Sequence, residues 1–76
     1  MNQLQTVIDR RNAIHPDEML DTDQLAPLIL QKPATLISWR SEGKGPPFYK
    51  LGRRVTYKWE DALLWMAAQR RDPRAA

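Results

Sequence analysis

The chain has no cysteine and only one histidine, His15, among its 76 residues. It can therefore form neither a disulfide framework nor a cysteine-based zinc site, and one histidine cannot build a metal cluster. No apolar run approaches the roughly 20 residues of a membrane span, and the N-terminus lacks the basic-then-apolar order of a signal peptide. We expect no metal site, no membrane partner, and a cytoplasmic location.

Catalytic motifs are also absent, since there is neither a phosphate-binding glycine loop nor a nucleophile elbow. Glu60 and Asp61 are adjacent carboxylates, but neighbouring helical residues point in different directions, and acids in a first turn suit the helix dipole. A domain of this length buries only roughly 60% of its unfolded surface, which leaves little room for an enclosed pocket. We predict that the protein is not an enzyme and uses no cofactor.

Positive charge is concentrated in the later part of the chain. Residues 1–30 carry two arginines against five carboxylates, a net charge of −3, whereas residues 31–76 carry ten basic residues against four acidic ones, a net charge of +6. This asymmetry favours a partner that offers phosphates, although many solvated surfaces also carry basic charge.

Helical signals recur along the sequence. Apolar residues at helical spacing predict a short amphipathic helix over residues 3–14. Asp21, with Gln24 three residues later, predicts a second helix with a capping box, and Pro27 implies that this helix is kinked or short. Pro33 is expected in the first turn of a third helix, which Gly43 ends.

The third helix has an inner and an outer face. Leu36 and Trp39 are expected to face inward, and Trp39 and Trp65 are assigned to the core. The residues left for the outer face are Ala34, Thr35, Ile37, Ser38 and Ser41. A last helix is expected from Trp59 to Arg71, with acids in its first turn and arginines in its last.

Between these helices, aromatic and β-branched residues from Phe48 to Tyr57 flank a single turn glycine, Gly52. They predict a β-hairpin whose tip is cationic because Arg53 and Arg54 follow the glycine. A short helix beside such a hairpin indicates a winged helix-turn-helix, mainly α with a two-stranded wing. We divide the chain into an N-terminal extension with a short helix (1–19), the DNA-binding domain (20–71) and a flexible tail (72–76).

Two segments carry a family resemblance: Leu20-Asp21-Thr22-Asp23-Gln24-Leu25-Ala26 with Pro33-Ala34-Thr35-Leu36, and Trp39-Arg40-Ser41-Glu42-Gly43-Lys44-Gly45-Pro46-Pro47-Phe48 continuing into Lys50-Leu51-Gly52-Arg53-Arg54-Val55. Over about residues 20–68 the chain resembles MerR-like winged helix-turn-helix proteins of the excisionase and AlpA type. The resemblance implies that Ala34, Thr35 and Ser38 face the major groove and that Arg53 and Arg54 contact the backbone or minor groove. Such proteins are often encoded by phages and other mobile elements.

The sequence departs from this family pattern at four positions. Leu30 stands where the turn commonly has glycine, Lys32 replaces a capping serine, and Ala34 replaces a common arginine. Leu63 occupies a position that is usually polar, so we expect the N-terminal extension or a second subunit to cover it.

The candidate DNA-binding residues form two groups. Those of the recognition helix are Lys32, Ala34, Thr35, Ser38, Arg40 and Ser41, and those of the wing are Lys44, Lys50, Arg53, Arg54, Tyr57 and Lys58. Arg40 has an alternative role, since it could brace the core by pairing with Glu42 or Glu60.

These residues predict sequence-specific binding of double-stranded DNA, as an excisionase (a recombination directionality factor) or as a transcriptional regulator of a mobile element. One helix and one wing cover few base pairs, so a homodimer or cooperative multimer on DNA is expected, with an integrase as a further candidate partner. The alternative is a protein-interaction module, an antirepressor or antitoxin, that uses Leu63. RNA binding is a third, weaker interpretation.

Overall fold

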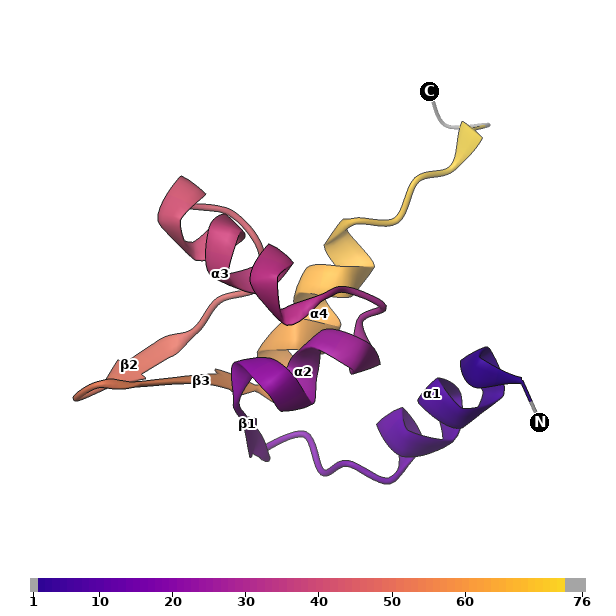
Figure 1. The fold of residues 1–76 in the computed structure, drawn as a ribbon. Helices are drawn as coiled ribbons and strands as arrows, with labels where there is room; N and C mark the ends of the chain where they lie inside the picture. Colours follow the sequence, from indigo (N-terminus) through magenta and orange to yellow (C-terminus); the bar gives the residue numbers. More distant parts are fainter. Residues whose placement is uncertain (1, 74–76) are drawn as a thin grey trace.

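A computed structural model describes residues 2–73, which form a mainly α-helical fold with a small antiparallel sheet (Figure 1). Of the tail expected at 72–76, residues 74–76 lie outside the described residues. The elements in order are α1 (Gln3–Asn12), β1 (Met19–Leu20), α2 (Thr22–Leu28), α3 (Pro33–Glu42), β2 (Tyr49–Leu51), β3 (Arg54–Lys58) and α4 (Trp59–Ala68).

Helix α2 begins with the predicted capping box. The backbone N–H of Gln24 donates to Asp21 Oδ1 at 2.8 Å, and the backbone N–H of Asp21 donates to Gln24 Oε1 at 2.9 Å. The helix is only seven residues long, so Pro27 lies in its last turn. A proline there removes one backbone hydrogen bond near a helix end rather than in the middle, and the helix is short as a result.

The turn between α2 and α3 reverses the chain at Leu30, whose φ is 59°. The N–H of Gln31 donates to the carbonyl of Ala26 at 2.9 Å, and the N–H of Leu30 donates to that of Pro27 at 3.2 Å. These two bonds form a Schellman motif, which requires a left-handed residue and is usually completed by glycine. Leucine adopts the same conformation here at a cost of about 1 kcal/mol.

Helix α3 begins and ends as the sequence predicts. Pro33 is its first residue, and Gly43 ends it in the left-handed conformation with a φ of 73°. Lys32 occupies the N-cap position, and its side chain makes no capping hydrogen bond. The helix therefore starts from the fixed φ of proline instead of from a cap.

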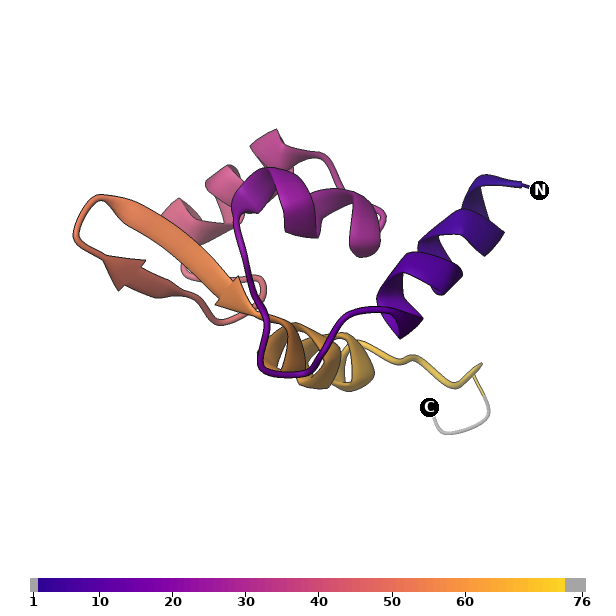
Figure 2. The ribbon, with the colours of Figure 1, turned by 90° about the horizontal axis from the view of Figure 1, so that it is seen from below.

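The sheet has the strand order β1-β3-β2 and is antiparallel throughout. Strands β2 and β3 form the predicted hairpin, with Tyr49 opposite Thr56 and Leu51 opposite Arg54. Strand β1 was not predicted; it pairs Met19 with Lys58 and Leu20 with Tyr57. The hairpin projects from the body of the molecule on the side opposite α1, as two perpendicular views show (Figures 1 and 2).

Helix α4 starts at Trp59 as expected, with Glu60 and Asp61 in its first turn. Its N-cap side chain makes no hydrogen bond; instead, the N–H groups of Trp59 and Glu60 donate to the carbonyls of Glu18 and Pro16, both at 2.9 Å. The helix ends at Ala68, so the prediction that it continues to Arg71 is wrong.

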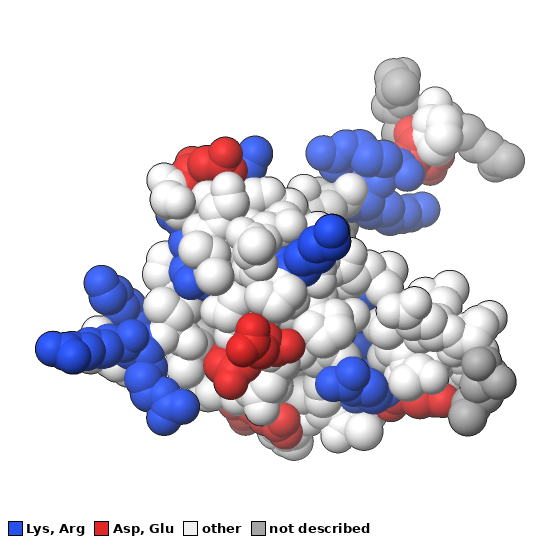
Figure 3. Space-filling model, viewed as in Figure 1, with Lys and Arg blue, Asp and Glu red and all other residues white. Residues whose placement is uncertain are grey.

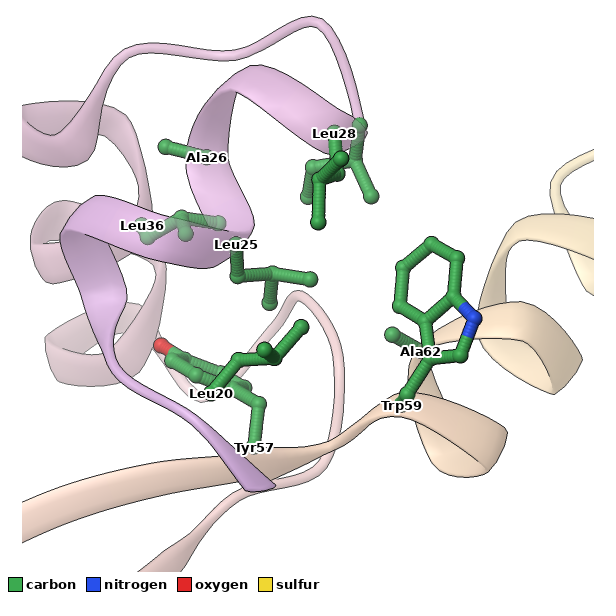
Figure 4. Packing of buried hydrophobic residues seen from close by; sticks show 9 residues of the cluster. Leu20, Leu25, Ala26, Leu28, Leu36, Tyr57, Trp59 and Ala62 are labelled. Atoms are coloured by element: carbon green, nitrogen blue, oxygen red, sulfur yellow. The ribbon is translucent and has the colours of Figure 1, made fainter. Parts of the chain in front are cut away.

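The core lies between α2, α3, the sheet and α4. Figure 4 shows Trp59 and Ala62 of α4 pointing toward the leucines of α2. The tryptophan assignment has to be corrected, because Trp59 is the buried one, 1% exposed. Trp39 and Trp65 are only partly buried and contact each other at the edge of the core, with ring centroids 5.6 Å apart.

Helix α1 packs against α2 through the buried Val7, and Arg11 Nε donates a hydrogen bond to the carbonyl of Leu28. The expectation that this N-terminal segment covers Leu63 is wrong, because Leu63 remains 39% exposed. None of the helices described is both long and apolar enough to cross a bilayer.

Candidate nucleic-acid interface

The tip of the hairpin is built around the turn Gly52-Arg53, which joins β2 to β3. Lys50, Arg53 and Arg54 are all exposed there, and none of the three makes an ion pair or side-chain hydrogen bond within residues 2–73. We call these three residues the cationic tip.

The pleat of the hairpin distributes the cationic tip over both faces. Cross-strand partners share a face and successive residues alternate, so Lys50 lies on the same face as Val55 and Tyr57. Arg54, opposite Leu51, lies on the other face, and Arg53 occupies the turn. The tip therefore offers positive charge on both sides of a thin ribbon.

No carboxylate offsets this charge nearby in the sequence, because residues 43–59 contain neither aspartate nor glutamate. Figure 3 shows Lys and Arg gathered on the projecting hairpin at the left, with further basic groups elsewhere, whereas the acidic side chains of this face lie off the hairpin, at the upper left, in the middle and along the lower edge. Unpaired, exposed cations attract a polyanion through counterion release.

Helix α3 lies on the same side of the molecule as the hairpin, away from α1 (Figures 1 and 2). Ala34, Ile37, Ser38 and Ser41 follow one another at helical spacing and are exposed, whereas Thr35 is half-buried. Ser41 Oγ donates to the carbonyl of Ser38 in its own helix at 3.2 Å. Lys32 lies at the start of this face, exposed and without an ion-pair partner among the described residues.

Arg40 points inward and links three elements. Its Nη1 donates to Thr22 Oγ1 of α2 at 3.0 Å and to Tyr57 Oη of β3 at 2.7 Å. Its guanidinium also lies 5.8 Å from the ring centroid of Phe48 and 6.0 Å from that of Tyr57. Arg40 thus braces α3 against the root of the hairpin, but its partners are hydroxyls and rings, not the carboxylates of Glu42 or Glu60.

Three residues assigned to the wing lie away from the cationic tip, at the root of the hairpin or in the loop before it. Tyr57 is 1% exposed, so its ring belongs to the core and its hydroxyl meets Arg40 rather than a phosphate. Lys58 is the last residue of β3, and its Nζ lies 3.5 Å from Asp17 Oδ1 and 3.6 Å from Glu60 Oε2. The carboxylate of Asp17, and then that of Glu60, raises the pKa of the Lys58 ammonium.

Lys44, the third of these residues, follows α3 in the loop before the hairpin, and its Nζ lies 3.6 Å from Glu42. The burial of Tyr57 removes it from the candidate DNA-binding residues. Lys44 and Lys58 remain candidates, each beside a carboxylate, and only Lys50, Arg53 and Arg54 of the wing set have no ion-pair partner within residues 2–73. The structure also identifies Thr22 and Phe48 as partners of Arg40, which the sequence did not single out. Ile37, which the sequence places on the outer face of the helix but not among the DNA-binding candidates, is 54% exposed at the centre of that face.

The spacing of Ile37 to Ala34, Ser38 and Ser41 predicts its place on the outer face, since these positions share one helical face. The hydrogen-bond partners of Arg40, Tyr57 and Thr22, carry no signal in the sequence, because they lie 17 and 18 residues away from it. The part of the chain from residue 2 to 73 contains no group of three or more His, Cys, Asp or Glu side chains that could hold a metal ion.

Comparison with protein-family models, with curated proteins and with solved structures finds no match to this chain. The interface described above therefore rests on the residues and geometry of this molecule.

Proposed function

We propose that the chain is a winged helix-turn-helix protein that binds double-stranded DNA, with α3 as the recognition helix in the major groove and the β2–β3 hairpin as the wing on the neighbouring groove. The observation that carries the proposal is the cationic tip, whose three exposed side chains have no partner within the described residues. Long cations left unpaired on a projecting ribbon are suited to phosphates.

The division of the cationic tip over two faces supports groove binding in particular. A thin ribbon that enters a minor groove lies between two phosphate backbones, and Lys50 and Arg54 point to opposite sides of the ribbon. Arg53, in the turn, is positioned to enter the groove itself, where a narrow minor groove attracts arginine. The brace at Arg40 supports the same arrangement, because it fixes α3 relative to β3.

In this proposal one copy covers few base pairs, so several copies bind together on repeated sites. The protein acts as an excisionase, which shapes a recombination complex beside an integrase, or as a transcriptional regulator of a mobile element. These two outputs differ in the DNA they need: repeated sites that become bent for the excisionase, and an operator that overlaps a promoter for the regulator.

The test is binding to a labelled duplex from upstream of the protein's own gene and to a scrambled duplex of equal length, between about 50 and 200 mM salt. The variants are Arg53→Ala/Arg54→Ala and, as a control matched in charge, Arg70→Ala/Arg71→Ala beyond α4. We expect stepwise complexes and a preference for the native duplex. The tip variant should flatten the salt dependence by about two units, since each lost phosphate contact removes about 0.9.

Equal loss of affinity in both double variants would mean that net charge, and not the hairpin, holds the DNA. Weak binding that does not distinguish the two duplexes would direct the search to attachment-site DNA. No binding to either class of duplex at 50 mM salt would contradict the proposal.

A second candidate function is supported by the outer face of α4, where Leu63 and Leu64 are 39% and 64% exposed. In this alternative the protein is an interaction module, an antirepressor or antitoxin, that binds a partner protein through this face. Leu63→Glu distinguishes the two: it should abolish partner binding in the alternative and leave DNA affinity unchanged in the main proposal.

A further inference from the structure

The outward face of α3 has unusual chemistry for a helix that reads DNA. Arginine and lysine commonly read guanine, and asparagine and glutamine commonly read adenine, each with two hydrogen bonds. Helix α3 contains no lysine, asparagine or glutamine, and its single arginine, Arg40, is committed to Thr22 and Tyr57. Its acid, Glu42, lies at the helix end and pairs with Lys44.

The most prominent groups on this face are apolar side chains. Ile37, 54% exposed, lies at its centre, and the methyl group of Ala34 lies one turn earlier. Of the two serines, Ser41 donates its proton to the helix backbone, whereas the Ser38 hydroxyl makes no hydrogen bond within residues 2–73. Ser and Thr hydroxyls can bond to more than one base and so discriminate weakly.

From this face we infer that α3 recognises the 5-methyl groups of thymine, and hence that the protein selects sites rich in A·T pairs where the helix enters the major groove. The inference rests on the proposed function, since it assigns the ligand chemistry of that same helix. The thymine methyl is the one apolar group that a standard base pair presents in the major groove, and alkyl side chains pack against it. Ile37 is the central contact, and Ala34 and Ser38 lie beside it.

Charge complementarity explains why this apolar face meets DNA rather than another apolar surface. The hairpin that carries the cationic tip lies on the same side of the molecule as α3 (Figures 1 and 2). Lys32 occupies the N-cap position of the helix. Cations that bind the backbone hold the helix in the groove, and the short side chains of α3 allow its backbone to approach the base edges closely. Affinity then comes from the phosphates and selection from the methyl groups.

The experiment starts with selection of bound sequences from a library of random 20-base-pair duplexes. The most enriched duplex is then synthesised twice, once with thymine and once with deoxyuridine, which differs only by the missing methyl. We expect enrichment of A·T pairs, and a loss of affinity of about fourfold for each contacted methyl that is removed. In two further duplexes, a contacted thymine is replaced by 5-methylcytosine or by cytosine, each opposite guanine. The protein should bind the duplex with 5-methylcytosine more tightly than the one with cytosine.

Two variants assign the effect to Ile37. Ile37→Ala preserves helix propensity and should bind the thymine and deoxyuridine duplexes alike. Leu64→Ala, which shortens an even more exposed side chain on α4, should keep the full preference of the wild type for thymine.

The outcomes separate this inference from the proposed function. Tight binding to the enriched duplex with no difference between thymine and deoxyuridine would overturn methyl recognition and leave DNA binding intact. An Ile37→Ala protein that retains the thymine preference would overturn Ile37 as the residue that contacts the methyl groups. Binding without any enrichment of A·T pairs would overturn the selection of A·T-rich sites. A protein that binds no duplex at 50 mM salt would overturn the inference and the proposed function together.

Discussion

Two groups of basic side chains in this protein differ in their surroundings. Those of the cationic tip, Lys50, Arg53 and Arg54, are exposed and unpaired within residues 2–73. A second group, Arg11, Arg40 and Lys58, is engaged with a backbone carbonyl, with hydroxyls and rings, or with carboxylates. The same charge therefore serves the fold in one place and remains available in another, and position in the sequence does not separate the two groups.

The largest expected difference between the groups is in stability. Arg40→Ala removes hydrogen bonds from a charged donor and leaves the hydroxyls of Thr22 and Tyr57 without their partner. We expect the free energy of unfolding to fall by about 2 kcal/mol in urea denaturation. Lys50→Ala, the control from the cationic tip, should change it by less than about 0.5 kcal/mol. Similar losses in both variants would erase the distinction between the groups.

Tyr57→Phe examines one bond of the brace in isolation. It deletes the hydroxyl that accepts from Arg40 at 2.7 Å and keeps the buried ring. We expect a loss of about 1 kcal/mol in the same denaturation experiment. Tyr49→Phe, at an exposed position of β2, is the matched control and should be neutral. A neutral Tyr57→Phe protein would show that the aromatic contacts of Arg40, and not its hydrogen bond, hold α3 to the hairpin.

Leu30→Gly should change the stability of the protein without changing its charge. Glycine adopts the left-handed conformation freely, which relieves about 1 kcal/mol, and it loses roughly half of that gain through the greater entropy of the unfolded chain. A net rise of about 0.5 kcal/mol in stability is expected, with no change in the salt dependence of DNA binding. Destabilisation would mean that the leucine side chain, although exposed, contributes packing that outweighs its backbone strain.

The smallest effect should come from Lys58 and appear only in alkaline solution. Its carboxylate neighbours raise its pKa above the ordinary 10.5, so its contribution to stability is complete below that pH and is lost as the pH rises through the raised pKa. Between about pH 9 and pH 11.5 the wild type should therefore lose slightly more stability than Lys58→Met. Lys50→Met, which has no carboxylate partner in the described residues, should follow the wild-type curve.

Local signals predicted the helix boundaries that local chemistry determines. The capping box of Asp21 and Gln24, the first-turn Pro33 and the left-handed Gly43 are all confirmed. The predicted end of α4 at Arg71 is wrong, since the helix ends at Ala68. Arg70 and Arg71 would suit the dipole at the end of a helix, but basic residues do not determine where a helix ends. Strand β1 was missed because two residues are too few to show a period, and it exists only through its pairing with β3.

The candidate site was predictable to a smaller extent. The exposed cationic tip follows from the turn glycine and the residues after it, whereas the inward direction of Arg40 and the burial of Tyr57 depend on residues 17 or 18 positions away. The burial of the tryptophans likewise depends on the three-dimensional arrangement. Trp59 is buried because it follows directly from the paired end of β3, and composition does not reveal which of three tryptophans occupies that place.

Two glycines near the end of α3 will tolerate variation very differently. A Cβ added at Gly43 would meet nothing within 4 Å, so asparagine, which accepts left-handed backbone, is an acceptable replacement there. At Gly45, where φ is 93°, the added atom would lie 2.9 Å from the Trp39 ring. In a deep mutational scan that retains only folded variants, position 45 should accept no other amino acid. The loop that carries the chain from α3 to the hairpin thus depends on the absence of a single methyl group.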